Sequence, residues 1–351
     1  MWGINNIFQA VKKLLIALGG VLVLLIVFRL FTFFSSSPNS DDPYLTEFLS
    51  NYKIFAVSTP TGIHFCNEPV PLHDRSIRDR LDRELLSNTY YQSNTLLYIK
   101  RANRWFPVIE PILEKYGIPD DFKYLPLVES NLTNIISPAG ATGYWQLMKA
   151  TAKSYDLEIN EHVDERYDMQ LAAEAACKYL KEAYREFNNW TLAAAAYNRG
   201  IAGVKRQLKK QKTDNYYDLY LNTETSRYVF RLLAVKEIVS NPSKYGYHFR
   251  DKDLYPNIST HVITVDTSIT NLAGFARSLD INYRILKLHN PWLKRHNLPN
   301  TSGKAYNIII PDSGYYVFTQ IELDSANAIP DSSNIGLAND SIMPSDSSNN
   351  R

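Results

Sequence analysis

Hydrophobic and polar positions follow a helical period through most of the middle of the chain. Between residues 103 and 116, the apolar residues Trp105, Val108, Ile109 and Ile112 recur at the spacing of one helix face. Similar patterns predict further helices at residues 76–86, 171–184, 190–197 and 227–239. The periodicity therefore predicts a mainly α-helical domain over residues 66–250.

The period changes after residue 260. Residues 261–265 and 306–310 read as strands, and two short helical patches, 271–278 and 283–289, lie between them. This pattern predicts a small α+β module over residues 258–313. Beyond it, residues 314–351 are rich in serine, asparagine and aspartate, a composition typical of a disordered tail.

The N-terminal part contains an apolar run at residues 14–34, long enough for a helix to cross a bilayer, and with its two flanking lysines it predicts a transmembrane segment at 12–34. Lysines precede the run and aspartates follow it, so the positive-inside rule predicts residues 1–11 in the cytoplasm and the rest of the chain outside. A cleaved signal peptide is the alternative. The run is long for such a peptide and no Ala-x-Ala cleavage site follows it, so we expect a retained signal-anchor with a linker at 35–65.

Composition narrows the classes of function. The formal net charge is only +2 over 351 residues, so no basic field indicates a nucleic-acid partner. The two cysteines, Cys66 and Cys177, fit no metal-ligand spacing. We expect two free thiols, with a disulfide in an oxidising compartment as the alternative, and we expect no metal or cofactor. The sequence does not indicate an oligomeric state.

Glu129 is the first candidate for chemistry, because it follows the apolar run 125–128. A carboxyl group in apolar surroundings has a raised pKa, and a general acid that works near neutral pH needs such a pKa. A glutamate at a helix end is more often simply solvated, so the residue alone does not establish catalysis.

A turn of small residues follows at 137–143, where backbone and ligand can approach closely because Gly143 carries no side chain. Gln146 and Met148 come next and offer an amide group and an apolar wall, as a sugar site needs. The alternative is an ordinary turn between two helices.

Two later segments also carry polar groups. Four alanines at 193–196 predict a closely packed helix that ends on Tyr197 and Asn198, which can bond to a substrate or simply cap a core helix. Further on, Glu224 precedes Tyr228 by four residues. Glu224 can equally be a charge that stabilises a helix N-terminus.

Taken together and in this order, the segments resemble the catalytic domain of lytic transglycosylases, whose fold is like that of goose-type lysozyme. The matching positions are Glu129-Ser130, Ser137 to Gly143, Gln146 with Met148, Tyr197-Asn198 with Gly200, and Glu224-Thr225 with Tyr228. The resemblance implies a lysozyme-like helical domain that acts on the glycan strands of peptidoglycan, with Glu129 as the catalytic acid/base. It implies substrate-binding roles for Ser130, Ser137, Gly143, Gln146, Met148, Tyr197, Asn198, Glu224 and Tyr228.

By this resemblance, Glu129 donates a proton to the glycosidic oxygen between N-acetylmuramic acid and N-acetylglucosamine. It then accepts a proton from the C6 hydroxyl of the muramic acid, which attacks C1 of the same sugar and gives a 1,6-anhydro product. An intramolecular nucleophile has a high effective concentration and needs no second carboxylate to activate water.

The C-terminal module resembles LysM, a small unit that binds N-acetylglucosamine in peptidoglycan. Residues 265–268 read Val-Asp-Thr-Ser where the family usually has Gly-Asp-Thr-Leu, and Asn290 resembles the module's usual asparagine. The family's glycine is missing. The module is therefore either a glycan-binding unit or a structural appendage that packs on the catalytic domain.

Two other functions remain open at this point. A lysozyme-like muramidase on the same fold would need a second carboxylate to activate water, and Asp164, Asp168 and Glu224 are candidates. A non-catalytic tether that binds peptidoglycan would suit the predicted anchor and the LysM-like module, but it has no need of Glu129 as an acid.

Overall fold

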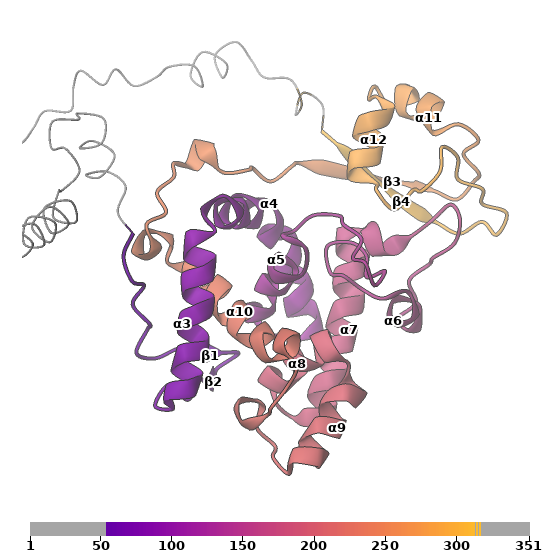
Figure 1. The fold of residues 1–351 in the computed structure, drawn as a ribbon. Coiled ribbons are helices and arrows are strands. Elements are labelled where there is room, and N and C mark those ends of the chain that lie inside the picture. The colour runs from indigo at the N-terminus through magenta and orange to yellow at the C-terminus, as the bar shows by residue number, and fades with distance from the viewer. Residues whose placement is uncertain (1–53, 313, 315, 317–351) are drawn as a thin grey trace, which may run out of the picture. The chain divides into compact units, whose positions relative to one another are not determined.

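The computed structural model describes residues 54–312, 314 and 316 of the chain (Figure 1). The described residues from 57 onward belong to one compact unit of the chain. The predicted signal-anchor at 12–34 lies outside the described residues, as do most of the predicted linker and nearly all of the predicted tail. Among the helices of the described residues, none is both long enough and apolar enough to cross a membrane.

The first part of the described chain is mainly helical, as its periodicity predicted. Its α-helices are α3 (Arg75–Tyr90), α4 (Gln92–Tyr116), α5 (Leu125–Ser130), α6 (Lys149–Ser154), α7 (Met169–Phe187), α8 (Trp190–Arg199), α9 (Ile201–Gln211) and α10 (Thr223–Ser240). Short 3-10 helices are η1 (Asp120–Tyr124), η2 (Glu165–Tyr167), η3 (Tyr216–Asp218), η4 (Pro242–Tyr245) and η5 (Asp251–Asp253), and β1 (His64–Phe65) pairs with β2 (Glu68–Pro69) in a small hairpin. The predicted helices are present but mostly longer than expected, and the pattern missed α9 and the hairpin.

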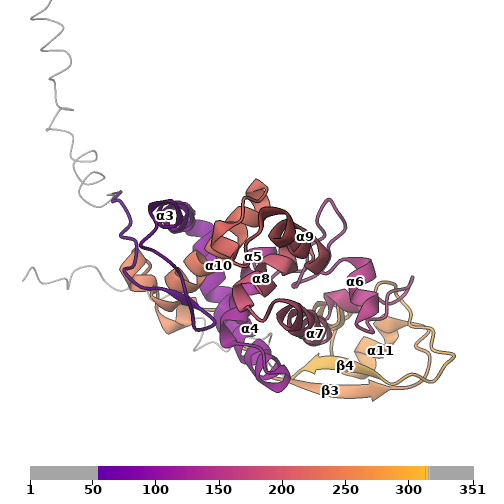
Figure 2. The same cartoon turned by 90° about the horizontal axis from the view of Figure 1, so that it is seen from below.

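Helix α10 organises the core, because it packs against α3, α4, α5 and α8 (Figures 1 and 2). Its residues Val229, Phe230, Leu232 and Leu233 are fully buried. These residues form two adjacent pairs, and neighbours in a helix point in different directions, so α10 is apolar on more than one face, as expected for a helix surrounded by others.

Helices α7 and α8 pack closely because their facing residues are small. The four alanines at 193–196 are all fully buried. Asn189 caps the N-terminus of α8 by accepting a hydrogen bond from the amide of Leu192 at 2.8 Å. Gly200 ends the helix with a φ of 81°, which confirms the C-cap predicted from the sequence.

The C-terminal module has the predicted order of strand, two helices and strand. It consists of β3 (Thr260–Val265), α11 (Leu272–Ser278), α12 (Tyr283–His289) and β4 (Tyr306–Pro311). The strands are antiparallel neighbours, with Thr260 opposite Pro311 and Val265 opposite Tyr306. The fold therefore confirms a mainly α chain with a small α+β module.

Asn290 is a structural residue of this module. It is fully buried, and its side-chain amide donates to the carbonyl oxygens of Leu286 at 3.0 Å and Ile309 at 2.7 Å. Its Oδ1 accepts a hydrogen bond from the amide of Ile309 at 2.8 Å. The asparagine noted in the sequence thus joins the end of α12 to β4.

The module packs on the helical part through backbone and side chains. The amide of Asp164 donates to the carbonyl of Trp292 at 3.0 Å, and the amide of Lys294 donates to the carbonyl of His162 at 2.7 Å. Lys304 adds ion pairs with Glu158 at 2.6 Å and Glu165 at 2.9 Å. These contacts agree with the appendage alternative and leave glycan binding by the module as a prediction.

Candidate active site

Glu129 lies near the C-terminal end of α5, a helix of six residues. Pro126 in the first turn has no amide hydrogen to satisfy, so it suits a helix start. The helix ends abruptly because Asn131 and Leu132 both have a positive φ, 54° and 49°. This sharp end directs the chain away and leaves the Glu129 side chain half-buried beside α10.

Two tyrosines stand next to this carboxyl group, Tyr228 fully buried and Tyr197 partly buried. Tyr228 of α10 donates a hydrogen bond from its hydroxyl to Oε1 of Glu129. Tyr197 of α8 donates from its hydroxyl to the carbonyl of Trp145 at 2.7 Å. Burial and the nearby negative charge of Glu129 hold the pKa of both phenols well above the ordinary value, so they remain protonated donors.

The pKa of Glu129 is raised from 4.5 to about 7. Burial is the main cause, and the charge of Glu224 raises the pKa further. The hydrogen bond from Tyr228 and the charge of Arg231 act in the opposite direction. Near neutral pH the carboxyl group can therefore both give and take a proton, as a single acid/base requires.

The loop of small residues lies against this site and is held rigidly. Gly143 has a φ of 83°, and a Cβ atom there would lie 1.9 Å from the carbonyl oxygen of Arg166. The side-chain amide of Gln146 donates to the carbonyls of Gly143 at 2.7 Å and Ile135 at 3.0 Å. The side-chain amide of Gln146 therefore stabilises the conformation of the loop by binding two of its backbone carbonyl groups.

The hydroxyl groups of Ser130 and Ser137 also form hydrogen bonds with backbone groups. The hydroxyl of Ser130 is buried and lies 2.6 Å from the carbonyl of Tyr144 and 3.0 Å from that of Pro126. It thereby ties the helix of Glu129 to the loop. Ser137 accepts a hydrogen bond from the amide of Ala141 at 3.0 Å and closes the turn.

The remaining predicted residues lie on three elements. Asn198 accepts a hydrogen bond from the hydroxyl of Thr225 at 2.9 Å, which joins α8 to α10. Glu224 is exposed and lies 3.5 Å from Arg231. Met148 is 46% exposed, and its side chain offers a free apolar surface. Glu129, Tyr197, Glu224 and Tyr228 thus interact as one electrostatic group. Ser137, Gly143 and Gln146 shape the loop beside it, and Ser130 joins that loop to α5.

Arg231 is a member of this group that the sequence interpretation missed. Its charge lowers the pKa of Glu129 and it pairs with Glu224. Arg231 follows Glu224 by seven residues, which is two helical turns, so the helical period could have indicated a shared face.

Two of the three candidate second carboxylates have other partners. Asp164 forms a buried ion pair with Arg166 at 2.8 Å. Asp168 caps α7 by accepting hydrogen bonds from the amides of Gln170 and Leu171, both at 2.9 Å. Glu224 is the one of the three whose charge acts on Glu129.

The described residues contain neither a disulfide nor a cluster of side chains that could hold a metal ion. Cys66 and Cys177 are buried free thiols, as predicted. Within residues 54–312, no group of three or more His, Cys, Asp or Glu side chains is placed to hold a metal ion.

Comparison with known proteins identifies both parts of the described chain. Residues 108–220 match the transglycosylase SLT domain, and residues 261–314 match the soluble lytic transglycosylase C-terminal LysM-like domain. Membrane-bound lytic murein transglycosylase D of Escherichia coli (strain K12) is 28% identical over 248 residues, 69% of this chain and 53% of that protein. The chain thus spans about half the length of this curated relative.

Other similar proteins are more distant or shorter in overlap. A putative tributyltin chloride resistance protein of Alteromonas sp. (strain M-1) is 30% identical over 129 residues, 36% of this chain and 62% of that protein. The 70 kDa soluble lytic transglycosylase of Escherichia coli aligns with a TM-score of 0.30 and 23% identity, covering 41% of this chain and 25% of that chain. An inactive mutant of lytic transglycosylase Slt from Pseudomonas aeruginosa aligns with a TM-score of 0.33 and 20% identity. The alignment covers 51% of this chain and 35% of that chain.

Proposed function

We propose that this chain, which carries a transglycosylase SLT domain and a LysM-like domain, is a peptidoglycan lytic transglycosylase. It would cleave the β-1,4 bond between N-acetylmuramic acid and N-acetylglucosamine and form 1,6-anhydro-N-acetylmuramic acid, for remodelling of the cell wall. The observation that carries this proposal is the half-buried Glu129, with a pKa of about 7 and a hydrogen bond from Tyr228.

In the proposed reaction, Glu129 carries out both proton transfers. Protonated Glu129 donates its proton to the glycosidic oxygen as the bond to C1 breaks. The resulting carboxylate accepts the proton of the C6 hydroxyl as its oxygen bonds to C1, so Glu129 is protonated again at the end. Tyr228 stabilises the carboxylate between the two transfers, because its hydroxyl remains a donor.

The other predicted residues have supporting roles in this proposal. The loop 137–143, Gln146 and Met148 would form one wall for the sugars, while Tyr197 and Asn198 would hold the opposite side. Glu224 would tune the pKa of Glu129 together with Arg231, since it is exposed and lies within reach of that arginine.

The placement in the cell is also part of the proposal. We infer that residues 12–34 anchor the chain in a membrane of the cell envelope, with residues 66–250 as the catalytic domain on the extracytoplasmic, periplasmic side. The similarity to a membrane-bound murein transglycosylase supports this location. The LysM-like module at 258–313 would hold the glycan strand near the catalytic domain.

Product analysis tests the reaction. Purified sacculi are digested with the protein, and the released fragments are analysed by mass spectrometry without chemical reduction. We expect fragments that end in anhydro-muramic acid, which are lighter by one water than their hydrolysed equivalents. Reducing muramic acid instead would identify a muramidase, and absence of cleavage would favour a binding tether.

A further inference from the structure

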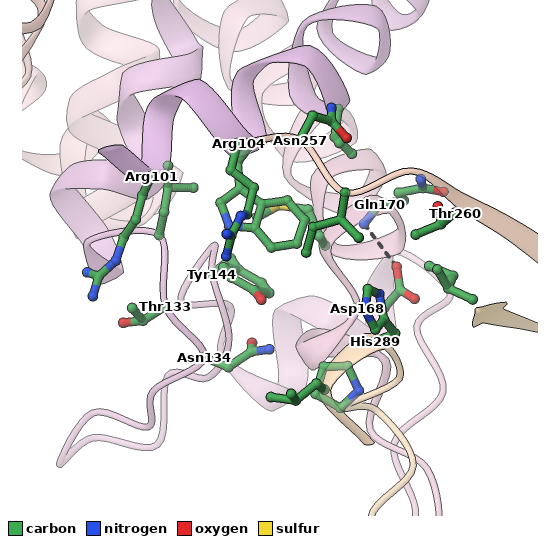
Figure 3. Close-up of a pocket in the computed structure, with 18 of the residues that line it drawn as sticks. Arg101, Arg104, Thr133, Asn134, Tyr144, Asp168, Gln170, Asn257, Thr260 and His289 are labelled. Carbon is green, nitrogen blue, oxygen red and sulfur yellow. Dashed lines mark hydrogen bonds between the residues drawn. The ribbon is translucent and has the colours of Figure 1, made fainter. Parts of the chain in front are cut away.

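A cavity of about 440 Å³ lies where α4, the start of α7 and the C-terminal module meet (Figure 3). Glu129 does not line it. The α4 wall consists of Arg101, Arg104, Trp105 and Val108, which share one helix face because they are spaced by three and four residues. The module contributes the opposite wall, including Thr260 and His289.

One side of the cavity presents hydrogen-bond donors. Figure 3 shows Arg104 extending from α4 toward Tyr144. Its Nε donates to the carbonyl of Pro256 at 3.1 Å, and its guanidinium lies 5.0 Å from the ring centre of Tyr255. The two Nη groups form no hydrogen bond with the described residues and can receive a planar carboxylate. Arg101 adds a second positive charge on the same face.

The other side presents acceptors that lack donors. Asp168 is 7% exposed, and only its Oδ1 is used to cap α7, so its Oδ2 has no hydrogen bond among the described residues. The Oδ1 of Asn134 is buried without a partner, while its amide donates to the carbonyl of Tyr167 at 3.2 Å. The buried Oδ1 of Asn134 costs free energy while it is unpaired, and the Oδ2 of Asp168 carries negative charge without a donor, so this side is suited to a ligand that donates.

The space between the two sides is apolar. Trp105 and Tyr144 pack with their ring centres 5.1 Å apart, and Val108 and Met169 also line the cavity. An aliphatic chain can lie against these residues. The cavity thus combines a carboxylate-binding end, an ammonium-binding end and an apolar middle.

We propose that this cavity binds the zwitterionic amino-acid end of a peptide attached to the glycan strand, with the carboxylate at Arg104 and the ammonium at Asp168 and Asn134. The identity of the peptide as a side chain of peptidoglycan rests on the proposed function. The chemistry of the ligand rests on the cavity alone. A neutral acetamido sugar does not require opposite charges at the two ends, so the cavity differs in kind from a sugar subsite.

Titration calorimetry of the full chain with three small probes tests the charge pattern. Diaminopimelate carries amines and carboxylates, pimelate lacks the amines, and 1,5-diaminopentane lacks the carboxylates. We expect diaminopimelate to bind at least about tenfold more tightly than either of the others, since each charge-assisted bond contributes more than a factor of ten. Equal binding of all three, or binding of chito-oligosaccharides that displaces diaminopimelate, would overturn the proposal.

A pair of matched variants locates the binding. Asp168→Asn keeps the capping oxygen but removes the charge, and Asp74→Asn does the same at α3, where Asp74 accepts hydrogen bonds from Ser76 and Ile77. Asp168→Asn should weaken diaminopimelate binding by about tenfold or more, whereas Asp74→Asn should leave it unchanged. Equal effects of the two substitutions would refute the assignment of the ammonium to Asp168.

Cleavage assays separate this proposal from the proposed function. Asp168→Asn should slow the cleavage of peptide-bearing strands but not of strands stripped of their peptides. If the unmodified chain cleaves neither substrate while calorimetry still shows the expected order of probes, the proposed reaction is wrong and the cavity assignment stands. If stripped and peptide-bearing strands are affected equally, the peptide assignment is wrong and the reaction stands.

Discussion

The hydroxyl of Tyr228, in α10, donates a hydrogen bond to Oε1 of Glu129, at the end of α5, across 99 residues of sequence. The bond stabilises the carboxylate and so opposes the effect of burial on the pKa of Glu129. The balance between these two effects, modified by Glu224 and Arg231, leads to the following expectations.

Glu129→Gln should reduce cleavage of sacculi by at least about a hundredfold, because an amide can neither donate nor accept the transferred proton at this position. The fold should persist, since the amide oxygen can still accept the hydrogen bond from Tyr228. Turbidity loss and product release measure the activity, and circular dichroism measures the fold. Unchanged activity in a folded variant would show that another group is the acid/base.

The rate of cleavage should fall on the alkaline side of the pH–rate profile as Glu129 loses its proton. Tyr228→Phe should move this falling limb to higher pH. The hydrogen bond lowers the pKa of Glu129, so its loss allows the pKa to rise above about 7. The rate should also fall roughly tenfold through loss of a bond to a charged group. Tyr216→Phe is the control, because this buried hydroxyl bonds to the carbonyls of Thr225 and Ser226 instead. A limb that stays in place would contradict the role assigned to Tyr228.

Glu224→Gln should have the opposite effect on the profile. The negative charge of Glu224 raises the pKa of Glu129, so removing it should shift the limb to lower pH. At neutral pH the activity should fall by less than about tenfold, since a shift of one pKa unit corresponds to a tenfold change in the ratio of protonated to ionised acid. Loss of all activity across the pH range would instead support the muramidase alternative. Glu237→Gln, which removes a charge paired with Lys244 near the other end of α10, serves as the control.

The raised pKa of Glu129 also predicts how stability depends on pH. The folded chain holds this proton up to about pH 7, whereas an unfolded carboxyl group releases it near 4.5. The contribution of Glu129 to stability is therefore fully present below pH 4.5 and is lost as the pH rises through 7. From pH 5 to pH 8, the free energy of unfolding of the parent should therefore fall by roughly 2 kcal/mol relative to that of Glu129→Gln. Urea unfolding at the two pH values measures this, and an equal difference at both would exclude a raised pKa.

Gly140 and Gly143, in the same loop, provide a matched test of how closely the backbone at Gly143 approaches the carbonyl of Arg166. Gly140→Ala should cost about 1 kcal/mol, because its φ of 85° is unfavourable for alanine but no atom lies within 4 Å of the added methyl group. Gly143→Ala should cost about 3 kcal/mol or more, because its methyl group would also overlap the carbonyl of Arg166. Equal costs in urea unfolding would mean that the loop can move away from Arg166.

The sequence predicted the helical domain and the module because both depend on local periodicity. It also singled out Glu129, since a carboxyl group after an apolar run is visible in one segment. It missed α9, whose polar face is broad. It placed the start of α4 eleven residues late because the apolar residues in the first half of that helix mostly stand in one consecutive run, 96–99, which shows no helical spacing.

The roles of several site residues depend on contacts between distant segments. The bond of Ser130 to the carbonyl of Tyr144 and that of Gln146 to Gly143 join backbone groups whose positions only the folded loop defines. The effect of Arg231 on Glu129 likewise depends on how α5 packs against α10. Motif order indicated that these residues belong together, but it could not separate groups that face the substrate from groups that shape the loop.

The burial of the two cysteines has a consequence for how the chain tolerates oxidants. Burial raises the pKa of Cys177 to about 12 and that of Cys66 further, so almost no thiolate exists at neutral pH. Thiolate is the species that attacks disulfides and reacts with oxidants, and both sulfur atoms are shielded by the core. Once folded, the protein can therefore carry two unpaired cysteines through an oxidising environment without mixed disulfides. The vulnerable stage is before folding is complete, when both thiols are exposed.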